Sequence, residues 1–150
     1  MRFGIIDPRT TRAEFVDAAD LNEAKIAVGL DPDKVDHGVL WRDLRTGGIS
    51  IVVYEFSLYL PIDRARYFAI GQSLFIGPAV LYGFDTVGET VDLPEIPPVF
   101  FLRDAAEVER AIAARQIIRP TVAINNVIVW RWPEPCWDEG IIQRMKEHAQ

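Results

Sequence analysis

Reactive and metal-binding side chains are scarce in this sequence. Cys136 is the only cysteine, and His37 and His148 are the only histidines among 150 residues. A single cysteine excludes an intramolecular disulfide and any metal site built from several cysteines. The N-terminal residues lack the apolar run of a signal peptide, and no apolar stretch approaches the roughly 20 residues of a membrane helix. We therefore expect a soluble protein of the reducing cytoplasm.

Basic residues are also fewer than acidic residues. The chain carries 16 Lys and Arg against 22 Asp and Glu, for a net charge of −6. A protein that binds nucleic acid through its phosphates needs a concentrated positive surface, and so does a protein that binds an anionic membrane. The composition therefore makes nucleic acid an unlikely partner, and we expect no membrane binding.

Familiar catalytic and cofactor motifs are missing. The sequence has no Gly-x-Gly-x-x-Gly dinucleotide fingerprint, no phosphate-binding P-loop and no Gly-x-Ser-x-Gly nucleophile elbow. His37 lies in Asp36-His37-Gly38, which favours a turn, and His148 is interpreted as a solvated residue at a helix end. Cys136, next to Trp137, is interpreted as a buried packing residue, with a nucleophilic thiol as the alternative. We expect no cofactor and favour a non-enzymatic protein.

Apolar residues are plentiful, at 49% of the chain, and this predicts a folded domain with a large core. No linker or low-complexity tract divides the sequence, so residues 1–150 are predicted to form a single globular domain. Two capping-box spacings, Asp20 with Glu23 and Asp104 with Glu107, predict helix starts. Asp138 can cap a third helix.

Strand patterns alternate irregularly with these helices. The expected strands cover residues 3–6, 13–17, 39–41, 49–56, 73–76, 79–82, 99–102 and 121–132. Residues 64–70 are expected to be a short helix or an irregular loop. This order favours an α+β fold with a mixed, mainly antiparallel curved sheet and about three helices packed on it. The alternative is a small β-barrel core with flanking helices.

One group of polar and aromatic residues is the main candidate site. Glu55 follows the strongest strand pattern, and Arg64 and Arg66, at a spacing of two, suit a clamp for a phosphate or carboxylate. Trp41 and Tyr54 offer flat apolar surface. We expect these residues to line one recess that binds a ligand or partner: Trp41, Tyr54, Glu55, Arg64 and Arg66. Ordinary surface ion pairs are the alternative interpretation of the arginines.

Two further clusters have weaker functional interpretations. Trp130 and Trp132 lie on the same face if their segment is a strand, so they are a possible aromatic interaction surface, although core packing explains them equally well. The carboxylates of Asp85, Glu89, Asp92 and Glu95 fall within one loop. Their spacing is not that of a calcium loop, so we expect no metal site there.

The middle of the chain resembles a family of small proteins of unknown function encoded by phages, plasmids and other mobile elements. The resemblance covers about residues 49–85. It is carried by the run Val53-Tyr54-Glu55-Phe56-Ser57-Leu58-Tyr59-Leu60-Pro61-Ile62-Asp63-Arg64-Ala65 and by Ile76-Gly77-Pro78-Ala79-Val80-Leu81-Tyr82-Gly83. Asp63 stands where the family usually has asparagine. The resemblance implies a mobile-element context and no particular activity.

These observations favour an accessory or binding protein that recognises another protein or a small anionic ligand. Two alternatives stay open from the sequence alone. One is a small hydrolase or nucleotide-handling enzyme that uses carboxylates such as Glu55 and Asp63 together with arginines. The other is a structural domain that forms homo-oligomers.

Overall fold

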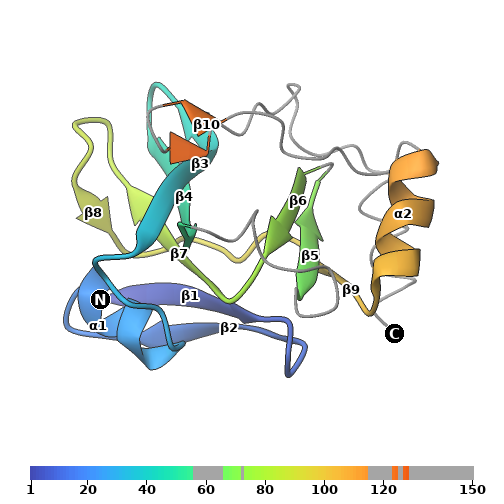
Figure 1. The fold of residues 1–150 in the computed structure, drawn as a ribbon. Helices are drawn as coiled ribbons and strands as arrows, with labels where there is room; N and C mark the ends of the chain where they lie inside the picture. The colour runs from blue at the N-terminus through green and yellow to red at the C-terminus, as the bar shows by residue number, and fades with distance from the viewer. Residues whose placement is uncertain (56–65, 72, 115–122, 125–126, 129–150) are drawn as a thin grey trace.

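The fold, taken from a computed structural model, is dominated by antiparallel strands (Figure 1). The structure describes residues 1–55, 66–71, 73–114, 123–124 and 127–128. The larger sheet contains β1 (Arg2–Asp7), β2 (Arg12–Asp17), β3 (Val35–Asp43), β4 (Gly47–Tyr54), β7 (Ala79–Phe84) and β8 (Thr90–Val91). Its strand order is β2-β1-β7-β4-β3, and β8 pairs with β7.

A second, three-stranded sheet has the order β6-β5-β9. It is formed by β5 (Tyr67–Ile70), β6 (Ser73–Ile76) and β9 (Phe100–Leu102). A short pair of strands, β10 (Ala123–Ile124) and β11 (Val127–Ile128), lies against β3 through β11. Every described strand pair is antiparallel, which is typical of sheets built from hairpins.

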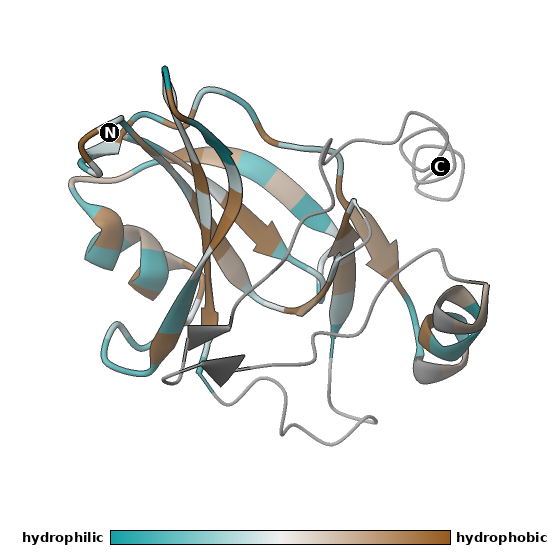
Figure 2. Ribbon diagram, turned by 90° about the horizontal axis from the view of Figure 1, so that it is seen from above, coloured by the Kyte–Doolittle hydropathy of each residue, from teal (hydrophilic) through white to brown (hydrophobic). Residues whose placement is uncertain are grey.

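The apolar core explains how these layers stack. Strand alternation sends one set of side chains from the larger sheet toward the three-stranded sheet, and the two sets meet in one buried cluster. Its members are Ile6, Leu40, Ile49, Ile51, Val53, Phe68, Ile70, Phe75, Ala79, Leu81 and Leu93. Figure 2 shows hydrophobic residues along the central strands and hydrophilic residues in many connecting turns.

Each sheet has its own helix on the face turned away from this cluster. The helix α1 (Leu21–Ala27) packs Ala24 against the larger sheet, next to Val52 and Val80. The helix α2 (Ala105–Ala113) packs Val108 and Ala111 against the three-stranded sheet. From one side to the other, the layers are α1, the larger sheet, the smaller sheet and α2.

The predicted fold class is wrong in its layout. Two helices lie in the described part of the chain, where about three packed on one sheet were expected, and they cover two different sheets. The alternative of a small closed barrel is also wrong for the described strands, because the path from β2 to β3 stays open. The expected third helix lies outside the described residues, and the single domain stays a prediction.

Two segments differ from the sequence expectation. Residues 67–70 form the strand β5 and not a helix or loop. All four of these residues are buried, because one face meets the larger sheet and the other meets α2's cluster. Of the strand predicted over residues 121–132, the described residues form two short strands, β10 and β11, which pair with each other, and the other residues lie outside the described part of the chain.

Candidate functional site

The β3–β4 hairpin positions most of the predicted site residues, and it separates one of them from the rest. Trp41 lies near the hairpin turn and pairs with Ile49. Tyr54 lies at the other end of β4 and pairs with Val35. Strands rise about 3.3 Å per residue, so the five residues from Ile49 to Tyr54 span roughly 16 Å. Trp41 and Tyr54 therefore occupy opposite ends of the hairpin.

Arg66 is brought to the same end as Tyr54 and Glu55. The Glu55 N–H donates to the Lys34 carbonyl at 3.0 Å, which extends the hairpin by one residue. The Gly77 N–H donates to the Arg66 carbonyl at 2.9 Å. Gly77 lies two residues before β7, the strand that pairs with β4 up to this end. The backbones of three predicted residues thus meet at one end of the hairpin, and the Arg66 side chain is exposed. The Tyr54 side chain packs in the cluster beneath α1, whereas Glu55 lies near Asp36 on the opposite face of the sheet.

Several other predicted or considered residues lie outside the described part of the chain. They are Asp63, Arg64, Trp130, Trp132, Cys136 and His148. Their roles stay predictions.

A pair of carboxyl groups occupies the same end of the hairpin. Asp36 pairs with Val53, so it lies close to Glu55. The pKa of Asp36 is raised, first by burial and then by the negative charge of Glu55. Such a carboxyl keeps its proton to a higher pH than usual, which suits hydrogen-bond donation or proton transfer.

The opposite face of the hairpin carries a second polar cluster. His37 Nδ1 lies 3.2 Å from the Tyr82 hydroxyl, and the two rings meet edge to face with centroids 5.9 Å apart. His37 lies on β3 and Tyr82 on β7, with β4 between them. The β4 residues on this face, Ser50 and Val52, are small enough for the two side chains to meet above them.

Lys25 lies on α1, the helix that covers this face of the larger sheet. It is only 5% exposed, and its Nζ has a long hydrogen bond of 3.4 Å to Asn22 Oδ1. Burial lowers the pKa of Lys25, although the charges of Asp20 and Asp33 oppose the shift. Burial, followed by the charge of Lys25, also lowers the pKa of His37. His37 is therefore neutral at pH 7 and can exchange a hydrogen bond with Tyr82 or a polar ligand.

Sequence reasoning missed this second cluster. A turn was expected at His37, yet the residue lies within β3. A signal was present, because His37 continues the alternation of Val35 and Val39. Lys25 likewise follows Ala24 on the apolar stripe of α1, where a charged residue is unusual.

The acidic loop uses its carboxylates to hold backbone. Asp85 Oδ1 accepts the N–H of Glu89 at 2.9 Å, which closes the turn after β7. Asp92 Oδ1 accepts the N–H of Arg2 at 2.8 Å. Among the described residues, no group of three His, Cys, Asp or Glu side chains is placed to hold a metal ion.

Two further observations complete the description. In the part of the chain that the structure describes, neither helix has the length and apolar character needed to cross a bilayer. Comparison with protein-family models, with curated proteins and with solved structures gave no match to this sequence or fold.

Proposed function

We propose that this chain is an accessory or binding protein that recognises a partner protein or a small anionic ligand at the open end of the β3–β4 hairpin. The observation that supports this most is the backbone hydrogen bond from Gly77 to Arg66, which brings the backbone of Arg66, a residue with an exposed side chain, to the end of the hairpin that holds Glu55. The resemblance of residues 49–85 to proteins of phages and plasmids adds the proposal of a mobile-element origin.

Arg66 and Glu55 have complementary chemistry. The guanidinium of Arg66 presents a planar fork of donors that matches a carboxylate or phosphate. Arginine side chains are enriched where proteins bind partners. Tyr54 does not join this pair, because its ring packs on the opposite face of β4, in the cluster beneath α1. Glu55 can orient the guanidinium and exclude ligands that carry excess negative charge.

The test measures binding of anionic probes to variants at this end of the hairpin. Inorganic phosphate and succinate are titrated into the intact chain by calorimetry. Arg66→Ala should weaken binding of the preferred probe by tenfold or more, equivalent to about 1.4 kcal/mol, because it removes a charge-assisted pair. Arg66→Lys should give an intermediate loss, because a lysine keeps the charge and loses the fork.

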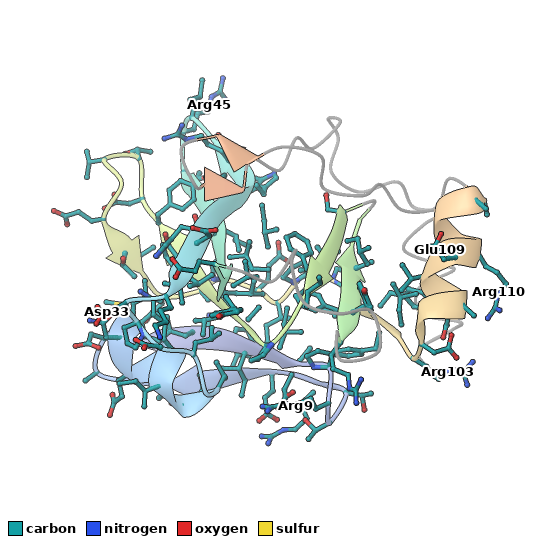
Figure 3. The ribbon with its side chains drawn as sticks, in the orientation of Figure 1. Arg9, Asp33, Arg45, Arg103, Glu109 and Arg110 are labelled. Atoms are coloured by element: carbon teal, nitrogen blue, oxygen red, sulfur yellow. The ribbon has the colours of Figure 1, made fainter. Side chains whose placement is uncertain are left out.

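Arg45→Ala is the matched control. Arg45 is also exposed, but it projects from the turn at the other end of the same hairpin (Figure 3). It should leave the affinity unchanged. Equal losses in Arg45→Ala and Arg66→Ala would show that only net charge matters, and no loss in Arg66→Ala would reject this site.

A second candidate function has its own supporting observation. Asp36 and Glu55 form a pair in which the pKa of one carboxyl is raised, as in many general acids. If the chain hydrolyses phosphate esters through this pair, Glu55→Gln should abolish turnover while leaving phosphate affinity measurable. If the unaltered protein turns over no phosphate ester in this screen, the hydrolase proposal is rejected and the binding proposal stands.

A further inference from the structure

The strand β2 forms one border of the larger sheet. It stands first in the order β2-β1-β7-β4-β3, and the residues of Arg12–Asp17 are all exposed except Val16, which is partly buried. Figure 1 shows β2 at the lower border of the ribbon. An exposed border strand offers unpaired N–H and C=O groups to another strand.

The hydrogen bonds at the start of the sheet show which groups of β2 point outward. Met1 and Ala18 exchange two bonds, each of 3.0 Å, so they form a hydrogen-bonded pair. Such pairs alternate along an antiparallel ladder, so the next pair, Arg2 with Asp17, is not bonded. The hydrogen bond of the Arg2 carbonyl is consistent with this, because that carbonyl points away from β2 and accepts the N–H of Leu93 at 2.8 Å.

Continuing this alternation divides β2 into two sets. The even-numbered residues bond to β1. The backbone groups of the odd-numbered residues face the open border: Ala13, Phe15 and Asp17.

We propose that two copies of this chain associate through β2, antiparallel about a two-fold axis at Phe15. Outward residues must pair with outward residues, which leaves few registers. When the two-fold axis passes through Phe15, this residue pairs with the partner's Phe15, and Ala13 pairs with the partner's Asp17. All three outward residues then form hydrogen bonds with the second copy. Centring on Glu14 or Val16 pairs only two of them, and centring on Glu14 also sets two like charges directly opposite each other.

The side chains of β2 favour a second copy as the occupant. Phe15 is 45% exposed, and the guanidinium of Arg2 lies 4.5 Å from its ring centroid. In the proposed register the two Phe15 rings are direct cross-strand neighbours, an arrangement that stabilises antiparallel pairs. Glu14 faces the partner's Val16, so no two like charges are directly opposite. The strand is thus complementary to itself, as a two-fold interface requires.

Concentration dependence gives the first test. One strand border buries less than the roughly 1,200–2,000 Å² of stable complexes, so we expect association at about 0.1–1 mM protein. Light scattering should show the mass rising from 17.0 kDa toward twice that value. Over the same range, amide exchange at Ala13, Phe15 and Asp17 should slow several-fold, while the even-numbered amides of β2 stay unchanged. A constant mass, or association without this alternating pattern, would overturn the proposal.

Cysteine cross-linking tests the register. Phe15→Cys places two cysteines opposite each other, with Cα atoms about 5.5 Å apart, within the range of a disulfide. Ala13→Cys places the two introduced cysteines about 13 Å apart along the strands, which is too far for a disulfide. Oxidation should therefore yield covalent dimer from Phe15→Cys and none from Ala13→Cys above the background that Cys136 gives in the unaltered chain. Equal yields would overturn the register.

A proline variant tests the hydrogen bonds themselves. Ala13→Pro removes an outward N–H that has no partner in β1, so the single chain should keep its fold. It should weaken association by tenfold or more. If Ala13→Pro associates as the unaltered chain does, the strand border is not the interface.

Discussion

His37 shows how one residue can link stability to pH. Burial, and then the charge of Lys25, lowers its pKa below the ordinary value of 6.5. The unfolded chain therefore binds a proton at a pH where the folded chain does not. Because stability rises with pH wherever the unfolded state binds more protons, the folded state is favoured as the pH increases through this window.

We predict that the free energy of unfolding decreases as the pH falls from 7.5 to 5.5. The His37 contribution is fully present above about pH 6.5 and is lost below it, with a slope of at most about 1.4 kcal/mol per pH unit. Urea unfolding at several pH values measures the slope. Asp7, whose pKa is lowered by its hydrogen bonds with Arg9, titrates below this window. Asp36, whose pKa is raised by burial, acts in the opposite direction to His37, because the folded chain binds that proton more tightly than the unfolded chain does.

His37→Gln is the control, since glutamine can still reach the Tyr82 hydroxyl but does not titrate. The variant should show a flatter dependence over the same range. Lys25→Met should also reduce the slope, because it removes the charge that opposes protonation of His37. An unchanged slope in His37→Gln would assign the dependence to other groups.

At the scale of an element, the β3–β4 turn depends on Gly47. Its φ of +103° is strained for other residues, and an added Cβ would overlap the carbonyl oxygen of Phe84. Gly88, in the turn after β7, has a similar φ of +87° but open space around it. An alanine at Gly88 would therefore introduce backbone strain alone, whereas an alanine at Gly47 would introduce both backbone strain and steric overlap.

We predict that Gly88→Ala costs about 1 kcal/mol and Gly47→Ala about 3 kcal/mol or more. The first variant introduces only a left-handed alanine, and the second must also push β4 away from β7. Chemical unfolding of both variants measures the difference. Equal costs would mean that the hairpin shifts freely at this turn.

Some elements could be predicted from local sequence. Both predicted helix starts are confirmed, with the N–H of Glu23 bonded to Asp20 and the N–H of Glu107 bonded to Asp104, each at 2.8 Å. Each glutamate accepts the N–H of the residue before the cap, Ala19 or Arg103, in place of that of the cap itself. A cap involves residues three apart, so the sequence contains all of the information. Strand β5 was missed for the opposite reason. Its residues are buried on both faces, which removes the alternation that identifies a strand.

The candidate site was predictable only in part. Tyr54 and Glu55 are neighbours in sequence, so their place at the same end of the hairpin follows from the strand pattern, which also sends their side chains to opposite faces. The backbone of Arg66 reaches the same end of the hairpin through its hydrogen bond with Gly77, and no local pattern contains that bond. The contact between His37 and Tyr82 depends on β7 pairing with β4, two strands that are not consecutive in the chain.

For the whole molecule, the cluster between the two sheets is the main structural link. Phe68 and Phe75 from the smaller sheet stack with centroids 5.3 Å apart and an interplanar angle of 16°. They belong to the same buried cluster as Ile51 at the centre of the larger sheet. Neither sheet can expose its inner face without uncovering the other.

We therefore predict that the two sheets unfold together. Phe68→Ala should cost about 3–5 kcal/mol, because it opens a cavity in a shared core. Amide exchange should accelerate equally for Ile51 and for Ile70, one in each sheet. Loss of protection in the smaller sheet alone would contradict this coupling.

Leu44→Ala provides the comparison. Leu44 is also a large apolar residue, but its side chain is 88% exposed in the β3–β4 turn. Its removal should change the free energy of unfolding by no more than about 0.5 kcal/mol.

The position of β7 has a consequence for how the protein is made. Both early hairpins, β1–β2 and β3–β4, can form as they leave the ribosome, but the strand between them, Ala79–Phe84, is translated later. Until then, β1 and β4 each keep an unpaired edge next to apolar side chains, the situation in which nascent chains aggregate. We therefore expect the interval between the emergence of Tyr54 and of Phe84 from the ribosome to be when this chain is most prone to aggregate.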